Sequence, residues 1–148
     1  MTQASVFGTP VPGETYKHRY VVSAVIVDPQ GRVAVMRVGD RHFLPGGGIE
    51  MGESEAETLT REVREECACG VVIGARLGEA TFYQYAPAYG GWAIHSVYYR
   101  AAFGGALDVA PEPDHSLLYL SPEEADACLF RRSDAWAVGL ALSTGPGA

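Results

Sequence analysis

The chain has 148 residues and a formal net charge of −7, with 47% hydrophobic and 20% charged residues. This length fits one domain with a hydrophobic core, and the composition excludes a disordered chain. The acidic balance argues against a protein that follows a nucleic-acid backbone, which needs a basic face. The acidic charge does not argue against a small phosphorylated substrate, because bound cations can supply positive charge locally.

The sequence also predicts a protein with no membrane partner. The longest apolar stretches, residues 21–27 and 135–142, are too short to span a bilayer, and no basic segment followed by an apolar run marks a signal peptide. Cys67, Cys69 and Cys128 have no paired zinc spacing. They favour reduced thiols and a cytoplasmic location.

The first elements in chain order are predicted strands. Residues 1–15 are rich in Gly, Pro and Thr and predict a loose lead-in to a single domain over residues 1–148. Residues 19–27 and 33–38 are rich in β-branched side chains and predict two strands. The intervening residues 28–31 have the Pro and Gly positions of a type I turn, so the two strands are expected to form a hairpin.

A helix is predicted after the glycine-rich loop at residues 44–48. Ser54 and Glu57 form a capping box, which places the helix start there. Spacings of three and four give the helix one apolar face, made by Ala56, Leu59, Val63 and Cys67. The helix should end near residues 68–70.

The second half of the chain predicts two long strands, a short strand and two helices. Residues 71–85 and 92–103 form the long strands, and residues 117–120 form the short one. Ser121 begins one helix, with Pro at the first position and acids in the first turn. Residues 133–142 form the closing helix. This order of elements predicts an α/β fold, with a mixed β-sheet and helices on its faces.

Three glutamates of the predicted helix, Glu62, Glu65 and Glu66, fall within about 100° of arc, away from the apolar face. Such an oxygen-rich set suits Mg²⁺ or Mn²⁺. For the glutamates alone, the alternative is an acidic helix face in water. For the glycine loop alone, the alternative is a flexible turn. The chemical interpretation depends on the two features standing together.

Together they resemble a known motif. Gly47, then Glu53 after five residues, then the run from Arg61 to Glu66 after seven more, is similar at fixed spacing to the box of the Nudix (MutT-like) family. The resemblance covers most of the chain from about Arg19 onward, and it includes the segment 119–125. The chain differs from the family pattern at the end of the box, where Ala68 and Cys69 stand in place of Gly and an aliphatic residue. Phe43 stands where many relatives have Trp.

The resemblance implies an α/β/α sandwich with a strand–loop–helix metal site. Glu62, Glu65 and Glu66 would hold Mg²⁺ or Mn²⁺, with the Gly46 carbonyl as a backbone ligand. Arg61 and Glu53 would orient the carboxylates through charge-assisted hydrogen bonds. These five side chains, Glu53, Arg61, Glu62, Glu65 and Glu66, are the candidate catalytic residues. The implied reaction is metal-assisted hydrolysis of a phosphoanhydride in a nucleotide-derived substrate.

The general base and the substrate contacts stay open. Relatives use either a box glutamate or an acid on a later loop, and Glu112 and Asp114 are the later candidates, with His115 adjacent. Candidate substrate-binding residues are the arginines beside the glycine loop and aromatics around the predicted hairpin loop at Pro87, namely Arg37, Arg41, Tyr83 and Tyr85, with Tyr89 and Trp92 nearby. Ordinary solvated arginines and sheet-packing aromatics are the alternatives.

Three functions compete. The first is a Nudix pyrophosphohydrolase acting on a nucleoside triphosphate or another nucleoside diphosphate derivative. The second is a catalytically silent Nudix domain that senses a nucleotide or sugar nucleotide, which the complete set of glutamates and Arg61 disfavours. The third, a plain acidic metal binder, leaves the glycine loop and Arg61 without a role. The family often forms dimers, so a homodimer is a further expectation.

Overall fold

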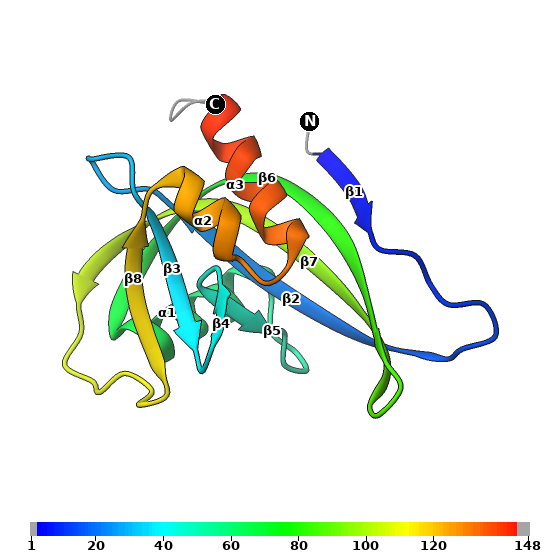
Figure 1. Ribbon diagram of the computed structural model, residues 1–148. Helices are drawn as coiled ribbons and strands as arrows, with labels where there is room; N and C mark the ends of the chain where they lie inside the picture. The colour runs from blue at the N-terminus through cyan, green and yellow to red at the C-terminus, as the bar shows by residue number, and fades with distance from the viewer. Residues whose placement is uncertain (1–2, 145–148) are drawn as a thin grey trace.

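The computed structural model describes residues 3–144 of the chain. Its elements in chain order are β1 (Gln3–Phe7), β2 (Tyr16–Ile26), β3 (Val33–Val38), β4 (Arg41–Phe43), β5 (Gly46–Gly48), α1 (Glu55–Cys67), β6 (Cys69–Ala86), β7 (Gly90–Ala106), β8 (His115–Leu120), α2 (Pro122–Cys128) and α3 (Arg132–Thr144). Figure 1 shows the long strands β2, β6 and β7 crossing the molecule, with α2 and α3 near the C-terminal end of the chain.

The strands form two sheets. The larger has the order β1-β6-β7-β2-β5, and the smaller has the order β4-β3-β8. In the larger sheet β1 runs parallel to β6 and β2 runs parallel to β7, whereas β6 with β7 and β2 with β5 are antiparallel. The mixed sheet predicted from the order of elements is therefore confirmed.

Alternation along β2 explains why helices cover both faces of the larger sheet. Successive side chains of a strand point to opposite faces. Val22, Ala24 and Ile26 belong to one buried cluster with Leu59 and Val63 of α1. Val25 belongs to a second cluster, together with Ala137 and Val138 of α3. The helices α1 and α3 thus lie on opposite faces, which confirms the layered α/β arrangement (Figure 1).

The predicted hairpin between residues 19–27 and 33–38 is wrong. The turn itself is present, since Gly31 N–H donates to Asp28 C=O at 2.9 Å. Beyond one isolated bridge from Val27 to Val33, however, β2 and β3 do not pair and belong to different sheets. Both edges of β2 are already taken by β7 and β5, so β3 pairs instead with β4 and β8.

The predicted loose lead-in at residues 1–15 is also corrected. Residues 1–2 lie outside the described residues, but residues 3–7 form β1 at the edge of the larger sheet. Phe7 packs edge-on against Trp136 of α3, with ring centroids 5.9 Å apart. A strand of this kind is stabilised by partners far away in the sequence, so local composition does not reveal it. Residues 8–15 form the expected exposed loop.

The predicted helices and long strands are confirmed. Both capping boxes are formed, at Ser54 with Glu57 and at Ser121 with Glu124. The helix α1 ends at Ala68, which adopts the left-handed conformation with φ 53°. Among residues 3–144, no helix has the length and apolar character that crossing a membrane would require. The three cysteines form no disulfide.

Candidate active site

The glycine segment is part of the larger sheet. Gly46–Gly48 forms β5 and pairs antiparallel with residues 21–23 of β2. Gly46 has φ +145°, and a Cβ atom there would lie 2.1 Å from the Val22 carbonyl oxygen. A Cβ atom on Gly47 would lie 2.4 Å from the Glu62 carboxylate. Glycine is therefore required at Gly46, where the backbone lies directly against β2, while a side chain at Gly47 would displace the Glu62 carboxylate.

Arg61 links the glycine segment to the acidic face of α1, which is formed by Glu62, Glu65 and Glu66. Its Nε and Nη2 donate to the two carboxylate oxygens of Glu53 at 2.7 and 2.9 Å. Nη2 also donates to the Gly48 carbonyl oxygen at 3.0 Å. Nη1 donates to Glu62 at 2.9 Å and to Glu65 at 3.3 Å. One planar guanidinium thus orients three carboxylates and one backbone carbonyl.

Glu53 is held in its charged form. Its hydrogen bonds from Arg61, with a further one from the Glu50 backbone N–H, lower the pKa of Glu53 to about 2. The Thr58 hydroxyl adds another hydrogen bond at 2.9 Å. A permanently ionised Glu53 keeps Arg61 in one orientation, so the position of Glu62 and Glu65 depends on this pair.

Glu66 lies at the buried end of the same helix face. It is 7% exposed, and its Oε1 accepts a hydrogen bond from the Gly46 N–H at 2.9 Å. Burial, with a contribution from the charges of Glu62, Glu112 and Glu65, raises the pKa of Glu66 to about 8, against the opposing effect of the Gly46 N–H. Burial likewise raises the pKa of Glu62, although Arg61 partly offsets the effect.

The loop before β8 and the first residue of that strand bring Glu112 and His115 to the region of Glu66. The Nε2 atom of His115 lies 3.7 Å from Glu66 Oε2, and its Nδ1 atom lies 3.1 Å from Glu112 Oε2. The Glu112 N–H donates to the Glu65 carbonyl oxygen at 2.8 Å, which anchors the loop on α1. Of the later-loop candidates, Glu112 therefore reaches the acidic face, together with His115. Asp114 is exposed to solvent.

The contacts of the acidic face decide how it could hold a cation. Within residues 3–144, no three His, Cys, Asp or Glu side chains already stand in a geometry that could hold a metal ion. The hydrogen bonds of these carboxylates explain this, because Arg61 donates to oxygens of Glu62 and Glu65 while the Gly46 N–H donates to Glu66.

The chemistry of this donor set nevertheless fits a hard cation. Burial and the charges of three neighbouring carboxylates, Glu62, Glu112 and Glu65, raise the pKa of Glu66. The guanidinium of Arg61 is the compensating positive charge that binds two of them. The cluster keeps an excess of negative charge and of oxygen ligands, which Mg²⁺ or Mn²⁺ would balance.

A cleft leads away from Glu66. Its inner cavity, of about 220 Å³, is lined by Gly46, Gly47, Glu66 and His115. Its outer cavity, of about 280 Å³, is lined by the rings of Phe43, Trp92 and Phe130 and by Gln84 and Arg41. The two cavities share Arg19, Phe43 and Arg131, so they lie side by side, and together they are called the cleft.

The structure brings some predicted substrate residues to this cleft and leaves others outside it. Arg41 lines the outer cavity and lies over the Phe130 ring at 4.1 Å. Arg37 is exposed on β3 and lines none of the four cavities described here. The rings of Tyr83 and Tyr85 pack around Tyr16, at 5.6 and 6.4 Å, and also lie outside those cavities.

Sequence reasoning missed Arg19 and Arg131. Arg19 belongs to β2 and Arg131 precedes α3, so each is far in sequence from the acidic helix. The pairing of β2 with β5 brings Arg19 to the cleft, and the bond from Leu44 N–H to Asp134 of α3 ties the glycine segment to the Arg131 region. Only long-range topology reveals this proximity. The adjacent pair Arg131–Arg132 before a helix was the one available signal.

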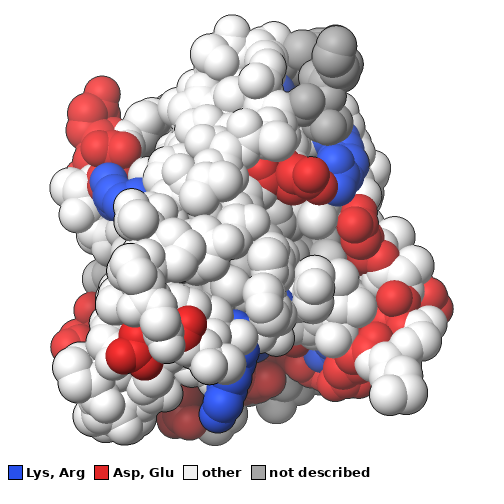
Figure 2. Space-filling view, turned by 90° about the vertical axis from the view of Figure 1, so that its right-hand side faces the viewer, with Lys and Arg blue, Asp and Glu red and all other residues white. Residues whose placement is uncertain are grey.

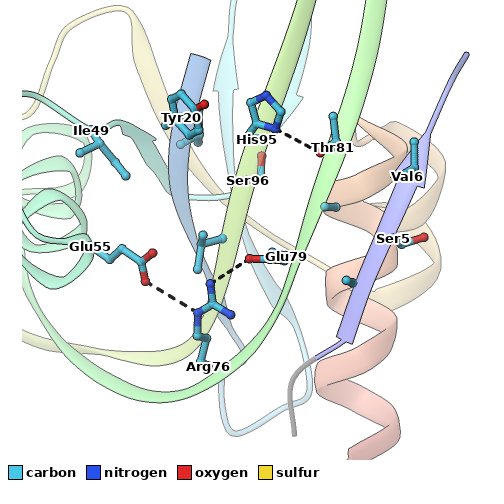
Figure 3. A pocket seen from close by; sticks show the side chains of 14 residues that line it. Ser5, Val6, Tyr20, Ile49, Glu55, Arg76, Glu79, Thr81, His95 and Ser96 are labelled. Atoms are coloured by element: carbon cyan, nitrogen blue, oxygen red, sulfur yellow. Dashed lines mark hydrogen bonds and ion pairs between the residues drawn. The ribbon is translucent and has the colours of Figure 1, made fainter. Parts of the chain in front are cut away.

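Two other cavities do not contain Glu62, Glu66 or His115. One, of about 530 Å³, lies between the start of α1 and strands β1, β6, β7 and β2 (Figure 3). Its wall carries His95, hydrogen-bonded to Thr81 at 3.1 Å, and Arg76, paired with Glu79 at 3.2 Å. The other, of about 740 Å³, follows the exposed side of α1 past Arg61 and Glu65 to residues 109–110.

Comparison with known proteins agrees with this architecture. The family model for the NUDIX domain matches residues 17–142, which include the whole acidic helix and its glycine segment. No curated protein matches the chain.

Solved structures with this fold are numerous, although distant in sequence. The ORF135 protein of E. coli is 24% identical, with a TM-score of 0.67 over 95% of this chain and 100% of that one. The E. coli dihydroneopterin triphosphate pyrophosphohydrolase is 18% identical, with a TM-score of 0.64 over 89% and 100%. The MutT protein of Methanosarcina mazei Go1 is 20% identical, with a TM-score of 0.62 over 84% and 91%. With the family model covering most of its length, the chain belongs to the NUDIX domain family.

Proposed function

We propose that this chain is a pyrophosphohydrolase that requires Mg²⁺ or Mn²⁺ and cleaves a phosphoanhydride in a nucleoside triphosphate or another nucleoside diphosphate derivative. The observation that carries the proposal is the surplus of carboxylates around Glu66. The Glu66 carboxylate is buried and accepts a hydrogen bond from the Gly46 N–H. The carboxylates of Glu62, Glu65 and Glu112 surround it. A fold has no stabilising reason to bury such a group among like charges, so a bound cation is the natural partner.

Glu62, Glu65 and Glu66 would hold the cation, with the Gly46 carbonyl oxygen as a further ligand. When bound, it would neutralise the anhydride oxygens and lower the pKa of a water molecule. Arg61, fixed by Glu53, keeps Glu62 and Glu65 turned toward the glycine segment. Charge-assisted hydrogen bonds of this kind hold carboxylates in place before the substrate arrives, which reduces the reorganisation that the reaction needs.

The pair of His115 and Glu112 supplies the candidate proton acceptor. His115 lies between the carboxylates of Glu66 and Glu112, at 3.7 and 3.1 Å. An imidazole in this position can take a proton from the attacking water, and Glu112 stabilises the imidazolium that results. The anchoring of Glu112 on the Glu65 carbonyl holds the acceptor beside the acidic face.

The cleft suits a nucleotide-derived substrate. Phe43, Trp92 and Phe130 line its outer cavity, and such rings can stack on a base. The E. coli neighbour that is named a dihydroneopterin triphosphate pyrophosphohydrolase and the Streptococcus suis neighbour that is named an ADP-ribose pyrophosphatase share the fold at 18% and 17% identity. Their names support nucleotide-like anhydrides as the first substrates to test.

A panel of nucleotides with Mg²⁺, Mn²⁺ or excess chelator tests the proposal. We expect metal-dependent release of a nucleoside monophosphate from at least one anhydride. Glu62→Gln should lose most of this turnover, whereas Glu123→Gln, on the exposed side of α2, should keep it. Tight nucleotide binding without turnover across the panel would favour a silent sensor domain instead.

A further inference from the structure

Three arginines in the cleft form no ion pair with any carboxylate of residues 3–144. They are Arg19, Arg41 and Arg131, and all three line the outer cavity. The buried carboxylate of Asp134 is near enough to sense the charge of Arg131. Its oxygens, however, accept hydrogen bonds from the Tyr98 hydroxyl and the Leu44 N–H.

Aromatic stacking fixes how two of these guanidinium groups are presented. Arg41 lies 4.1 Å from the centroid of Phe130, and Arg131 lies 5.0 Å from the centroid of Phe43. A guanidinium that stacks on a ring keeps its N–H donors in its own plane, where they can still bind an anion. The stacked pairs therefore offer pre-positioned donors, and binding costs less side-chain entropy than it would for free arginines.

This positive charge contrasts with the rest of the molecule. The chain has 11 Lys and Arg against 18 Asp and Glu, and acidic side chains are more widespread than basic ones on the face shown in Figure 2. These arginines repel one another, and no carboxylate of the described residues forms an ion pair with them. Their stabilising partner is therefore expected to be a ligand.

The anhydride alone does not account for all three arginines. Arg19 and Arg131 line both cavities and can reach phosphates next to Glu66. Arg41 lines only the outer cavity, which contains no carboxylate side chain. A ligand that satisfies Arg41 must therefore carry negative charge at a distance from the cleavage point.

We propose that the preferred substrate carries a second anionic group, a phosphate monoester or a carboxylate, on the part of the molecule remote from the scissile anhydride. Arg41 and Arg131 bind that group in the outer cavity, and Arg19 lies between it and the anhydride. This inference rests on the proposed function, because it names the substrate class of the same site.

Matched substrate pairs test the inference. NADPH and NADH differ by a remote phosphate, and UDP-glucuronate and UDP-glucose differ by a remote carboxylate. In at least one pair, we expect the member with the remote anion to have a kcat/KM at least about tenfold higher. This ratio is the effect expected from one hydrogen bond to a charged group. The pair that shows the difference identifies which anion the cavity takes.

Variants test whether the preference for a remote anion arises from the arginines of the cleft. The double variant R41Q/R131Q should reduce it to less than about twofold, whereas R41K/R131K, which keeps both charges, should retain part of it. Arg32→Gln removes the same charge from the distant turn at residues 28–32 and should leave the preference unchanged. Tyr20→Ala, in the cavity of Figure 3, should also leave it unchanged. If the double variant does not fold, Arg41→Gln alone is informative, because Arg41 is exposed.

The outcomes separate this inference from the proposed function. Equal or better turnover of the member that lacks the remote anion, in both pairs, overturns the inference. A preference that survives in R41Q/R131Q overturns it as well. Turnover confined to anhydrides without a remote anion also overturns it, while the proposed function stands. If no anhydride is cleaved under any condition, both fail.

Discussion

Glu66 is the one buried glutamate among residues 3–144. It is buried beside the Gly46 N–H, with other carboxylates around it. Burial raises its pKa from the ordinary 4.5 to about 8. At neutral pH the metal-free protein therefore keeps a proton on Glu66, and cation binding must displace that proton.

This pKa predicts how stability depends on pH. Because the pKa is raised in the folded state, the contribution of Glu66 is fully present below pH 4.5 and is lost as the pH rises toward about 8. The thermal midpoint of the metal-free protein should therefore fall across this window, and Glu66→Gln should flatten the fall. Calorimetry in chelator checks this, and parallel curves for the two proteins would contradict it.

Arg61 is the other decisive residue, and its removal should affect both stability and activity. Arg61→Ala leaves Glu53, Glu62 and Glu65 without their shared donor. We expect a loss of about 2–3 kcal/mol, since hydrogen bonds to charged groups are the strong ones, and turnover should fall at least tenfold, roughly the effect of one lost charged hydrogen bond. Magnesium should partly restore the thermal midpoint by binding the folded state. An unchanged midpoint with and without magnesium would count against the role of Arg61.

At the scale of elements, the strand–loop–helix unit from β5 to α1 owes its shape to glycines and caps. Gly47 lets the backbone lie against Glu62, and the capping box at Ser54 begins α1. The helix ends at Ala68 in a left-handed conformation, with φ 53° and ψ 37°, where the family box has glycine. Ala68 therefore ends the helix in the same way as the family glycine would, but its backbone is strained.

Ala68→Gly should relieve that strain. Alanine in the left-handed region costs about 1 kcal/mol relative to glycine, so the variant should be more stable by about that amount. Turnover should not change, because position 68 lies outside the acidic face. Ala56→Gly is the matched control in the same helix, and it should be destabilised by up to about 1 kcal/mol. A destabilised Ala68→Gly would show that the left-handed exit does not form.

Gly47→Ala tests the close approach of β5 to α1. The added methyl group would lie 2.4 Å from the Glu62 carboxylate, and a side-chain end can move aside at little cost. The variant should therefore fold with a midpoint close to that of the parent protein while turnover falls at least tenfold, because Glu62 is displaced. Gly105→Ala, which has open space around it, is the control. Normal turnover in Gly47→Ala would remove Glu62 from the site.

At the scale of the whole molecule, local patterns could be predicted and long-range contacts could not. The capping boxes, the burial of Leu59 and Val63 in α1 and the long strands β6 and β7 are encoded in neighbouring residues and were predicted, whereas Ala56, expected on the same apolar face, is exposed. The partner of β2 is β7, more than 70 residues away, so the expected hairpin with β3 was wrong. The contact of His115 with Glu66 and the cleft made by Arg19 and Arg131 likewise depend on tertiary folding.

One measurement tests the central claim, which is hydrolysis of an anhydride by water at the acidic face. The protein is incubated with the best substrate of the panel in ¹⁸O-labelled water, with magnesium or with chelator. The products are then analysed by mass spectrometry. The account predicts one labelled oxygen on a phosphorus of the cleaved anhydride, only with magnesium, and almost none for Glu66→Gln. Full cleavage in chelator, or release of inorganic phosphate from simple monoesters with every anhydride left intact, would contradict it.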